Sequence, residues 1–236
     1  MTQDQTAEFV DLYNRLEAAI REAYDVPREV GAVAWLIKNE RGFGGVRDAL
    51  DYCREVRNLL QHNERVGGEY AVVPSPAMLD LLRQTTLRVE RMPRSIDLCT
   101  KAADVCSAAM GDRVLPVMAR MAERSYTHAP ILEDGRVVGV FSESTLMAYL
   151  VRDEIVEVGE KDTFAALAGL LPVGAHGGAE TFAFVAEDAL ATEVAGMFRE
   201  SLRRSERLGM VFVTAHGDEG ERMLGVITAW DMAAFF

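Results

Sequence analysis

Hydrophobic residues in the first 92 positions recur at helical spacing. The first stripe consists of Phe9, Leu12, Tyr13, Leu16 and Ile20. Their i, i+3, i+4, i+7 spacing predicts an amphipathic helix over about 6–24. Further helices are expected over 30–37, 46–65 and 76–92. The segment 30–37 is apolar nearly all round, which predicts a buried helix. Four helices with short connections predict a small antiparallel bundle.

Two local signals mark the connections in this part of the chain. Ser75 and Pro76 form a strong helix start, because serine caps the first free N–H groups and proline suits the first helical position. The glycine-rich stretch 41–45 is expected to be a turn.

The pattern changes after Pro93, where helix-like segments alternate with short β-rich runs. An expected helix over 114–124 precedes an expected hairpin over 129–140, and a helix over 143–150 follows. This order of helix, hairpin and helix is the first copy of a repeat.

The same order recurs near the C-terminus, where 225–228 leads into an expected helix over 229–236. A repeated order of elements says more about architecture than a single propensity. We therefore expect an α+β chain with a four-helix domain followed by two βαββα-type repeats. The expected domains are 1–92 and 93–236, with the repeats over about 97–152 and 161–236.

Charge and composition narrow the function classes. The chain has 236 residues, 49% of them hydrophobic, and a formal net charge of −12. Such a charge argues against a broad non-specific surface for nucleic acid or anionic membrane. Four arginines alternate with Glu200 and Glu206 in a pattern typical of a solvated helix face. They are Arg199, Arg203, Arg204 and Arg207.

The cysteines and the N-terminus carry expectations about metal and compartment. Cys53, Cys99 and Cys106 show no C-x-x-C spacing, so no metal site is expected, and their odd number suits reduced thiols. No stretch approaches the roughly 20 apolar residues that cross a bilayer, and the N-terminus does not resemble a signal peptide. We therefore expect a cytoplasmic protein that does not enter the membrane.

Two stretches together resemble a family. The first copy contains Lys-Ala-Ala-Asp-Val-Cys (101–106) and Ala-Pro-Ile-Leu-Glu-Asp-Gly-Arg-Val-Val-Gly-Val-Phe-Ser (129–142). The second ends in Gly-Val-Ile-Thr-Ala-Trp-Asp (225–231), a pattern of glycine, two apolar residues, threonine or serine, two variable residues and aspartate. Both resemble cystathionine-β-synthase (CBS) domains. The resemblance implies a paired module that binds an adenosine derivative such as AMP, ADP, ATP or S-adenosylmethionine.

The same resemblance assigns ligand-binding residues. It implies that Thr228 lies near a phosphate and that Asp231 accepts hydrogen bonds from ribose hydroxyls. In the first copy Ser142 matches the threonine, while Thr145 stands in place of the aspartate, and His128 is expected to line the first cleft. A second interpretation needs no ligand: Thr228 caps the last helix, and Asp231 favours its first turn through the helix dipole.

One helix of the first domain carries a different motif. The spacing Arg57-Asn58-x-x-x-His62 resembles the HEPN superfamily, whose ribonucleases carry these residue types. The resemblance implies a dimer in which His62 assists attack of an RNA 2′-hydroxyl, Arg57 stabilises the phosphorane and Asn58 orients the histidine, without a metal. The alternative is a helix end in which His62 interacts with the dipole and Arg57 pairs with a carboxylate.

Three functions remain open from the sequence. The first is a regulatory protein that needs no cofactor, in which a CBS pair senses an adenine nucleotide and biases the helical domain or a partner. The second is a nucleotide-regulated, metal-independent endoribonuclease that acts on RNA. The third is a structural oligomerisation module with empty clefts. The CBS resemblance and the HEPN resemblance both imply a homodimer.

Overall fold

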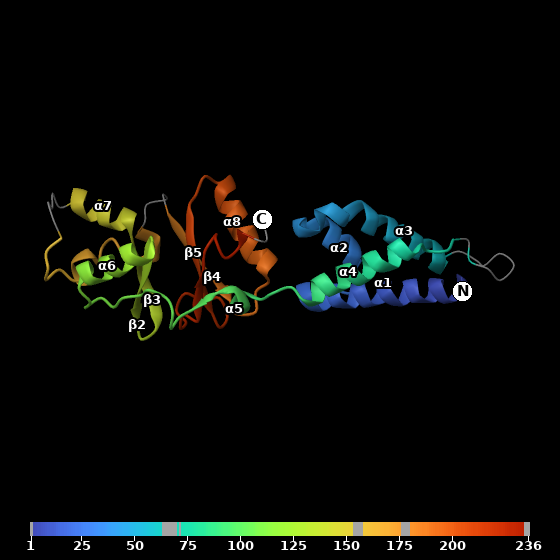
Figure 1. The fold of residues 1–236 in the computed structure, drawn as a ribbon, viewed down its shortest axis with the longest axis horizontal. Coiled ribbons are helices and arrows are strands. Elements are labelled where there is room, and N and C mark those ends of the chain that lie inside the picture. The colour runs from blue at the N-terminus through green and yellow to red at the C-terminus, as the bar shows by residue number, and fades with distance from the viewer. Residues whose placement is uncertain (1, 63–69, 71, 153–157, 176–179, 234–236) are drawn as a thin grey trace. The chain divides into compact units, whose positions relative to one another are not determined.

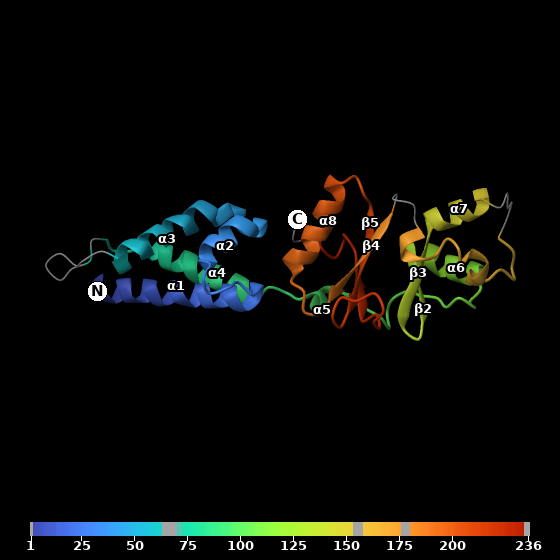
Figure 2. The same cartoon turned by 180° about the vertical axis from the view of Figure 1, so that it is seen from behind.

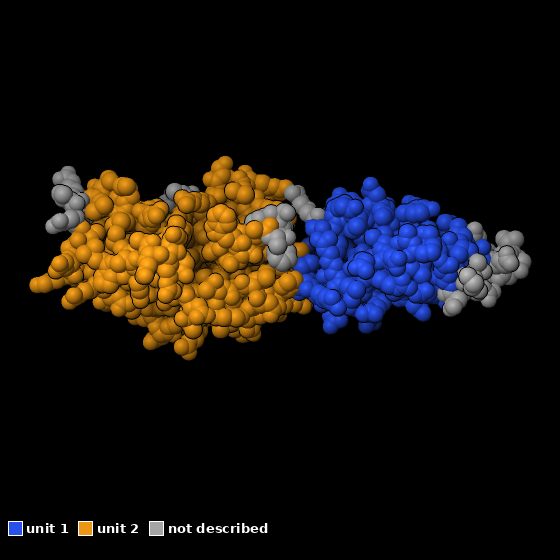
Figure 3. All heavy atoms as spheres, viewed as in Figure 1, with its two compact units in different colours: residues 1–92 blue, residues 93–236 orange. Residues whose placement is uncertain are grey.

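The computed structural model describes residues 2–62, 70, 72–152, 158–175 and 180–233. The chain divides into two compact units, residues 1–92 and residues 93–236, which Figure 3 colours separately. Helix and strand are both abundant, which confirms the expected α+β class.

The first unit is helical. Its elements are α1 (Thr2–Tyr24), α2 (Ala32–Asn39), the 3-10 helix η1 (Arg41–Val46), α3 (Arg47–His62) and α4 (Pro76–Glu90). Helices α1 and α4 pack along each other, as both views of the ribbon show (Figures 1 and 2). The predicted stripe of α1 supplies the core: Phe9, Leu16 and Ile20 are fully buried. The Ser75 cap is also confirmed, because its hydroxyl accepts from the N–H of Met78 at 3.4 Å.

Two local predictions in this unit were wrong. Helix α2 buries one face only, because Ala32, Val33 and Leu36 are inaccessible while Ala34 and Lys38 are exposed. The stretch 41–45 is not a simple turn but part of η1. Within η1 the side chain of Phe43 is 1% exposed and belongs to the core of this unit.

The second unit contains two sheets. Its elements are α5 (Ser95–Leu98), β1 (Thr100–Lys101), α6 (Val114–Arg124), β2 (His128–Glu133), β3 (Arg136–Ser142), α7 (Glu143–Arg152), η2 (Phe164–Leu167), η3 (Val173–Ala175), β4 (Thr181–Ala186), α8 (Ala191–Arg203), β5 (Leu208–Thr214) and β6 (Gly225–Ile227). Strands β2 and β3 form an antiparallel pair, and the other sheet has the order β1-β6-β5-β4. In that sheet only β4 and β5 are parallel. Helix α8 lies beside β4 and β5 in both views (Figures 1 and 2).

The first repeat has the expected βαββα order in β1, α6, β2, β3 and α7, although its leading strand β1 pairs with β6 of the second repeat and not with β2 or β3. A single parallel bridge between Ala108 and Ile131 lies beside its own hairpin. In the second repeat, residues 229–232 of the expected final helix form turns, Ala233 has 3-10 conformation, and 234–236 lie outside the described residues. The bonds there run from Asp231 N to Thr228 O and from Ala233 N to Trp230 O, over three residues instead of four. The local turn therefore replaces the first turn of an α-helix.

Strand β1 joins the start of this unit to its end. Thr100 lies opposite Val226, and Lys101 lies opposite Gly225. The approach at Gly225 is close, since a Cβ atom there would lie 2.5 Å from both Cys99 Sγ and Thr100 O. Glycine at this position lets β1 reach the edge of β6, which brings Thr100 beside the segment that follows β6.

Among the described residues, no helix is both long and apolar enough to cross a membrane. The described part of the chain also contains no group of three or more His, Cys, Asp and Glu side chains that could hold a metal ion.

Candidate functional site

The turn after β6 is built by Thr228 and Asp231. Oδ2 of Asp231 accepts from the backbone N–H of Thr228 at 2.7 Å and from its hydroxyl at 2.8 Å. The carboxylate of Asp231 thus caps the turn, whereas the hydroxyl of Thr228 donates and does not accept from a later N–H, as the side chain of an N-cap residue would. No bond from the described residues engages Oδ1 of Asp231, so this oxygen is able to accept from another group.

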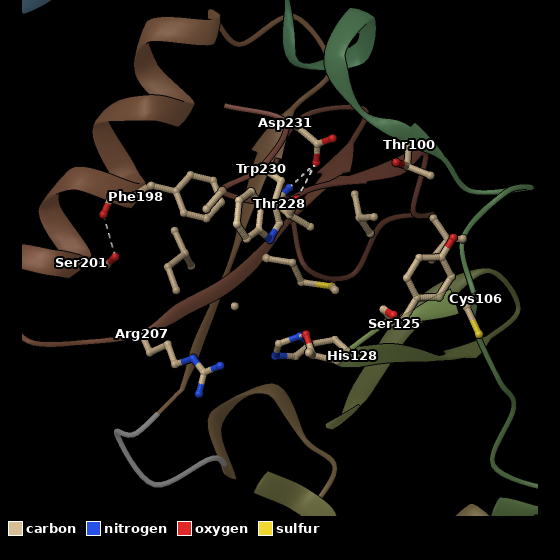
Figure 4. Close-up of a pocket in the computed structure, with 18 of the residues that line it drawn as sticks. Thr100, Cys106, Ser125, His128, Phe198, Ser201, Arg207, Thr228, Trp230 and Asp231 are labelled. Atoms are coloured by element: carbon tan, nitrogen blue, oxygen red, sulfur yellow. Dashed lines mark hydrogen bonds between the residues drawn. The ribbon is translucent and has the colours of Figure 1, made fainter. Parts of the chain in front are cut away.

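This turn opens into a pocket of about 710 Å³. The pocket lies within the second unit and collects residues from β1, from the segment before β2, from α8, from β5 and from the turn after β6. Figure 4 shows Thr228, Trp230 and Asp231 along one side and Arg207 and His128 along the other. A volume of this size is typical of small-molecule and cofactor sites.

The pocket has an apolar interior and an aromatic rim. Phe198, Met210 and Val226 line it and are no more than 6% exposed. At the rim Tyr126 is 41% exposed and Trp230 is 89% exposed. Such surfaces suit the face of a planar heterocyclic ring, which stacks on aromatic side chains and avoids water.

Charged groups of both signs line the same pocket. Arg124 and Arg207 are exposed, and neither guanidinium forms an ion pair with a described residue. Two arginines near Arg207 in sequence do form ion pairs, since Arg203 and Arg204 both pair with Glu200. The predicted solvated face is therefore confirmed for these two arginines, whereas Arg207 is a cation at the pocket.

The first repeat builds a second polar cluster around Glu180. Oε1 of this carboxylate lies 2.8 Å from Nε2 of His128, and Oε2 accepts from the hydroxyls of Ser142 and Ser144, both at 2.8 Å. Because an ionised carboxylate only accepts, Nε2 of His128 carries the proton. Thr145 completes the cluster, since its Oγ1 accepts from the N–H of Ser142 at 3.2 Å.

These bonds set the acidity of Glu180. Burial to 5% exposure by itself raises the pKa, because a carboxylate loses hydration. The hydrogen bonds from His128, Ser144 and Ser142 outweigh burial and lower the pKa from 4.5 to about 2. Glu180 is therefore ionised throughout the neutral range.

The depressed pKa predicts an acid-dependent contribution to stability. A carboxylate with a lowered folded-state pKa stabilises the fold above its unfolded pKa and loses that effect as pH falls, here from 4.5 toward 2. We expect the gap in unfolding free energy between wild type and Glu180→Gln, on the order of 3 kcal/mol at pH 7, to close over this range. Urea unfolding at several pH values measures it, with Glu187→Gln as the exposed control. A gap that is independent of pH would contradict the carboxylate's role.

The three residues of the HEPN-like motif, Arg57, Asn58 and His62, all lie on α3. The guanidinium of Arg57 lies 3.9 Å from Glu17 and 5.6 Å from the centre of the Tyr13 ring. Its Nε is inaccessible and has no hydrogen-bond partner among the described residues. Asn58 is half-buried, and the side chain of His62 lies outside the described part of the chain. Glu17 is therefore the carboxylate that the pairing alternative requires for Arg57.

The structure divides the ligand-binding residues expected from the sequence. Thr228, Asp231 and His128 line the open pocket. Ser142 and Thr145 are no more than 3% exposed and lie in the Glu180 cluster instead. His128 belongs to both, because it faces the pocket and contacts Glu180.

Sequence reasoning missed four residues that line the pocket, Thr100, Arg124, Tyr126 and Trp230. It also missed Glu180, the centre of the polar cluster. Trp230 occupies a variable position inside the closing motif, so the sequence already showed a large aromatic residue next to the expected ligand-binding residues. The others come from segments whose proximity depends on how the repeats pair.

A scan against protein families matches the CBS domain over residues 99–152. No curated protein is significantly similar to the chain in sequence. Solved structures similar to 61% of the chain include a protein assigned to acetoin utilization (AcuB) from Vibrio cholerae, at 16% identity, with 90% of that chain covered and a TM-score of 0.44. Another is the CBS domain pair of protein MJ0100 in complex with 5-methylthioadenosine and S-adenosyl-L-methionine, at 16% identity, 96% coverage of that chain and a TM-score of 0.43.

A further structure, CBSX2 in complex with AMP, is 14% identical, covers 60% of this chain and 94% of its own, and has a TM-score of 0.43. The family match lies on the segment that contains β1, the hairpin of β2 and β3, and α7. Residues 99–152 of the chain are therefore similar to a CBS domain.

Proposed function

We propose that residues 93–236 bind an adenosine derivative in the pocket at Asp231, and that occupancy regulates this chain or a partner protein. The observation that carries the proposal is the position of the turn of Thr228 and Asp231. It opens into a pocket of about 710 Å³ that has an apolar interior and two arginines without ion-pair partners among the described residues. The same two residues are those to which the CBS resemblance assigns the ligand.

Each part of a nucleotide has a chemical counterpart in this pocket. Oδ1 of Asp231 suits a ribose diol, because a carboxylate oxygen accepts strongly from hydroxyl groups. Phe198 and Met210 offer an apolar slot for the base, and Trp230 a stacking face. The cations Arg124 and Arg207 suit a phosphate or a carboxylate.

Capping alone explains less of the geometry. The cap uses Oδ2 of Asp231 and the N–H of Thr228, and it requires no cavity. It gives no reason for Trp230 to be 89% exposed beside an apolar pocket. Binding of a planar ligand accounts for both features, because it would remove the indole and the pocket wall from water.

Trp230 also supplies the test. The chain has two tryptophans, Trp35 and Trp230, so Trp35→Phe leaves Trp230 as the sole indole reporter. We expect titration with one of AMP, ADP, ATP or S-adenosylmethionine to change its emission saturably. The same ligand should raise the melting temperature, because a ligand at 100 times its dissociation constant adds roughly 2.7 kcal/mol to the free energy of unfolding. The matched control is Trp230→Phe, in which Trp35 in the other unit should not respond.

If none of the four ligands changes the Trp230 emission or the melting temperature, the proposal is overturned. The remaining function would then be the third one, a structural module with empty clefts. Regulation itself requires a ligand that binds two states of the protein with different affinity. We include in this proposal that the ligand is an adenine nucleotide and that the protein responds to it as a homodimer.

The ribonuclease alternative has its own experiment. The HEPN resemblance makes Arg57, Asn58 and His62 a metal-independent site, whereas the pairing of Arg57 with Glu17 favours a structural role. The regulatory proposal predicts no cleavage of single-stranded RNA in EDTA, with or without the stabilising nucleotide. Cleavage that disappears in His62→Ala and persists in the neighbouring Gln61→Ala would establish the enzyme instead.

A further inference from the structure

We propose that Glu180 is a built-in occupant of the anion site of the first repeat, so that the module takes one nucleotide per chain, in the pocket at Asp231. The statement about stoichiometry rests on the proposed function. The statement about Glu180 rests on the geometry of the first repeat alone.

The two repeats place corresponding residues in the same local arrangement. In the second repeat, the side chain of Asp231 accepts from the N–H of Thr228 at 2.7 Å. In the first, Oγ1 of Thr145 accepts from the N–H of Ser142 at 3.2 Å, and the N–H of Thr145 donates back to Oγ of Ser142 at 3.3 Å. The first repeat thus has the same turn at the start of α7, but with a hydroxyl in place of the carboxylate.

A carboxylate from elsewhere in the chain enters this arrangement. Glu180 directly precedes β4 and is 5% exposed. Its oxygens are bound by Ser142, Ser144 and His128, all at 2.8 Å. Two hydroxyls, an imidazole N–H and the N-terminus of a ten-residue helix are the groups that bind a phosphate in proteins. Glu180 therefore places a negative charge where an anionic ligand group would otherwise bind.

The geometry distinguishes an occupant from a ligand-binding carboxylate. Asp231 lines an open pocket and has Oδ1 without a hydrogen bond from the described residues, whereas both oxygens of Glu180 are already bonded within the protein. A buried carboxylate with both oxygens bonded has no acceptor to offer a ribose. A phosphate brought to Ser142 would also meet the charge of Glu180 at close range in a poorly hydrated site, where like charges repel strongly.

His128 connects the occupied site to the open one. It lines the pocket at Asp231, and its side chain is 8% exposed while its Nε2 is held by Glu180. Removing the carboxylate would leave Nε2 of His128 and the two serine hydroxyls without their acceptor. These groups would then be available to an external anion.

The test counts ligands and uses phosphate as an independent probe. Calorimetric titration of the wild type with AMP should give one site per chain. Inorganic phosphate should raise the melting temperature of Glu180→Ala but not that of wild type, with at least tenfold tighter phosphate binding in the variant. Glu187→Ala, which removes an exposed carboxylate just after β4, is the matched control and should behave as wild type.

Each outcome separates this inference from the proposed function. Two AMP molecules per wild-type chain would overturn it, as would a folded Glu180→Ala that binds phosphate no better than wild type. If Glu180→Ala does not fold, Glu180→Gln keeps the shape without the charge and must bind phosphate more tightly than wild type. Phosphate binding to the variant, with no binding of AMP, ADP, ATP or S-adenosylmethionine to wild type, would defeat the proposed function and leave Glu180 as the occupant.

Discussion

Replacing Asp231 by alanine is expected to weaken binding of the nucleotide by roughly 10- to 100-fold. A hydrogen bond to a charged group contributes about 1.5–3 kcal/mol, and each 1.4 kcal/mol is a factor of ten in the dissociation constant. Asp231 lines the pocket, and its Oδ1 has no hydrogen bond from the described residues, so we expect this contribution to be lost with the side chain. Titration of Trp230 emission in the Trp35→Phe background measures the dissociation constant.

The substitution also removes a cap, and two controls separate the effects. Loss of the bonds to Thr228 should cost about 1 kcal/mol of stability without ligand, which urea unfolding detects. Asp231→Asn retains an oxygen that can accept from the N–H of Thr228, so it should preserve stability better than it preserves affinity. Asp188→Ala removes an exposed carboxylate outside the pocket and should change neither. Wild-type affinity in Asp231→Ala would exclude Asp231 from the site.

The second large effect is expected from Gly225→Ala. The added methyl would lie 2.5 Å from Cys99 Sγ and from the carbonyl oxygen of Thr100, both closer than non-bonded atoms tolerate. The backbone oxygen cannot move away without separating β1 from β6. Overpacking of this kind costs about 1–3 kcal/mol, and we expect a value at the upper end for alanine. Unfolding in urea, followed by Trp230 emission in the Trp35→Phe background, reports the second unit alone.

Gly220→Ala is the matched control for this substitution. A methyl at Gly220 meets no atom within 4 Å, so its denaturation midpoint should stay close to that of the parent. Gly225→Ala should also weaken the nucleotide response, because displacement of β1 removes Thr100 from the pocket wall. Equal midpoints for the two variants would show that β1 does not pack against Gly225 as described.

Local patterns predicted the helices of the first unit well. The stripe that includes Phe9, Leu16 and Ile20 became the buried face of α1, and Ser75 capped α4 as expected. Both features depend on residues within one or two helical turns, so the sequence contains the necessary information. The extent of burial around α2 was wrong because it depends on which face meets the other helices.

Motif recognition reached part of the site. The turn of Thr228 and Asp231 is local, since its bonds join residues three apart. It was therefore predictable that the two side chains would meet. The helix expected after this turn was not found over residues 229–233, because bonds between residues three apart continue through Ala233.

The contacts of Glu180 show what no local pattern contains. Glu180 is 52 residues from His128 and 38 from Ser142 in sequence, and its own neighbours in the chain give no sign of either partner. The position of His128 between the cluster and the pocket is equally non-local. These contacts follow from the packing of strands and helices that are distant along the chain.

The sequence by itself determined the α+β class, the helices of the first unit and the closing motif with Thr228 and Asp231. Short-range periodicity, caps and spacing are sufficient for each of these. Only the tertiary structure decided that Ser142 binds Glu180 while Asp231 faces an open pocket. The physical reason is that hydrogen-bond partners and cavities depend on three-dimensional proximity, which the pairing of β1 with β6 and the packing of the two repeats create.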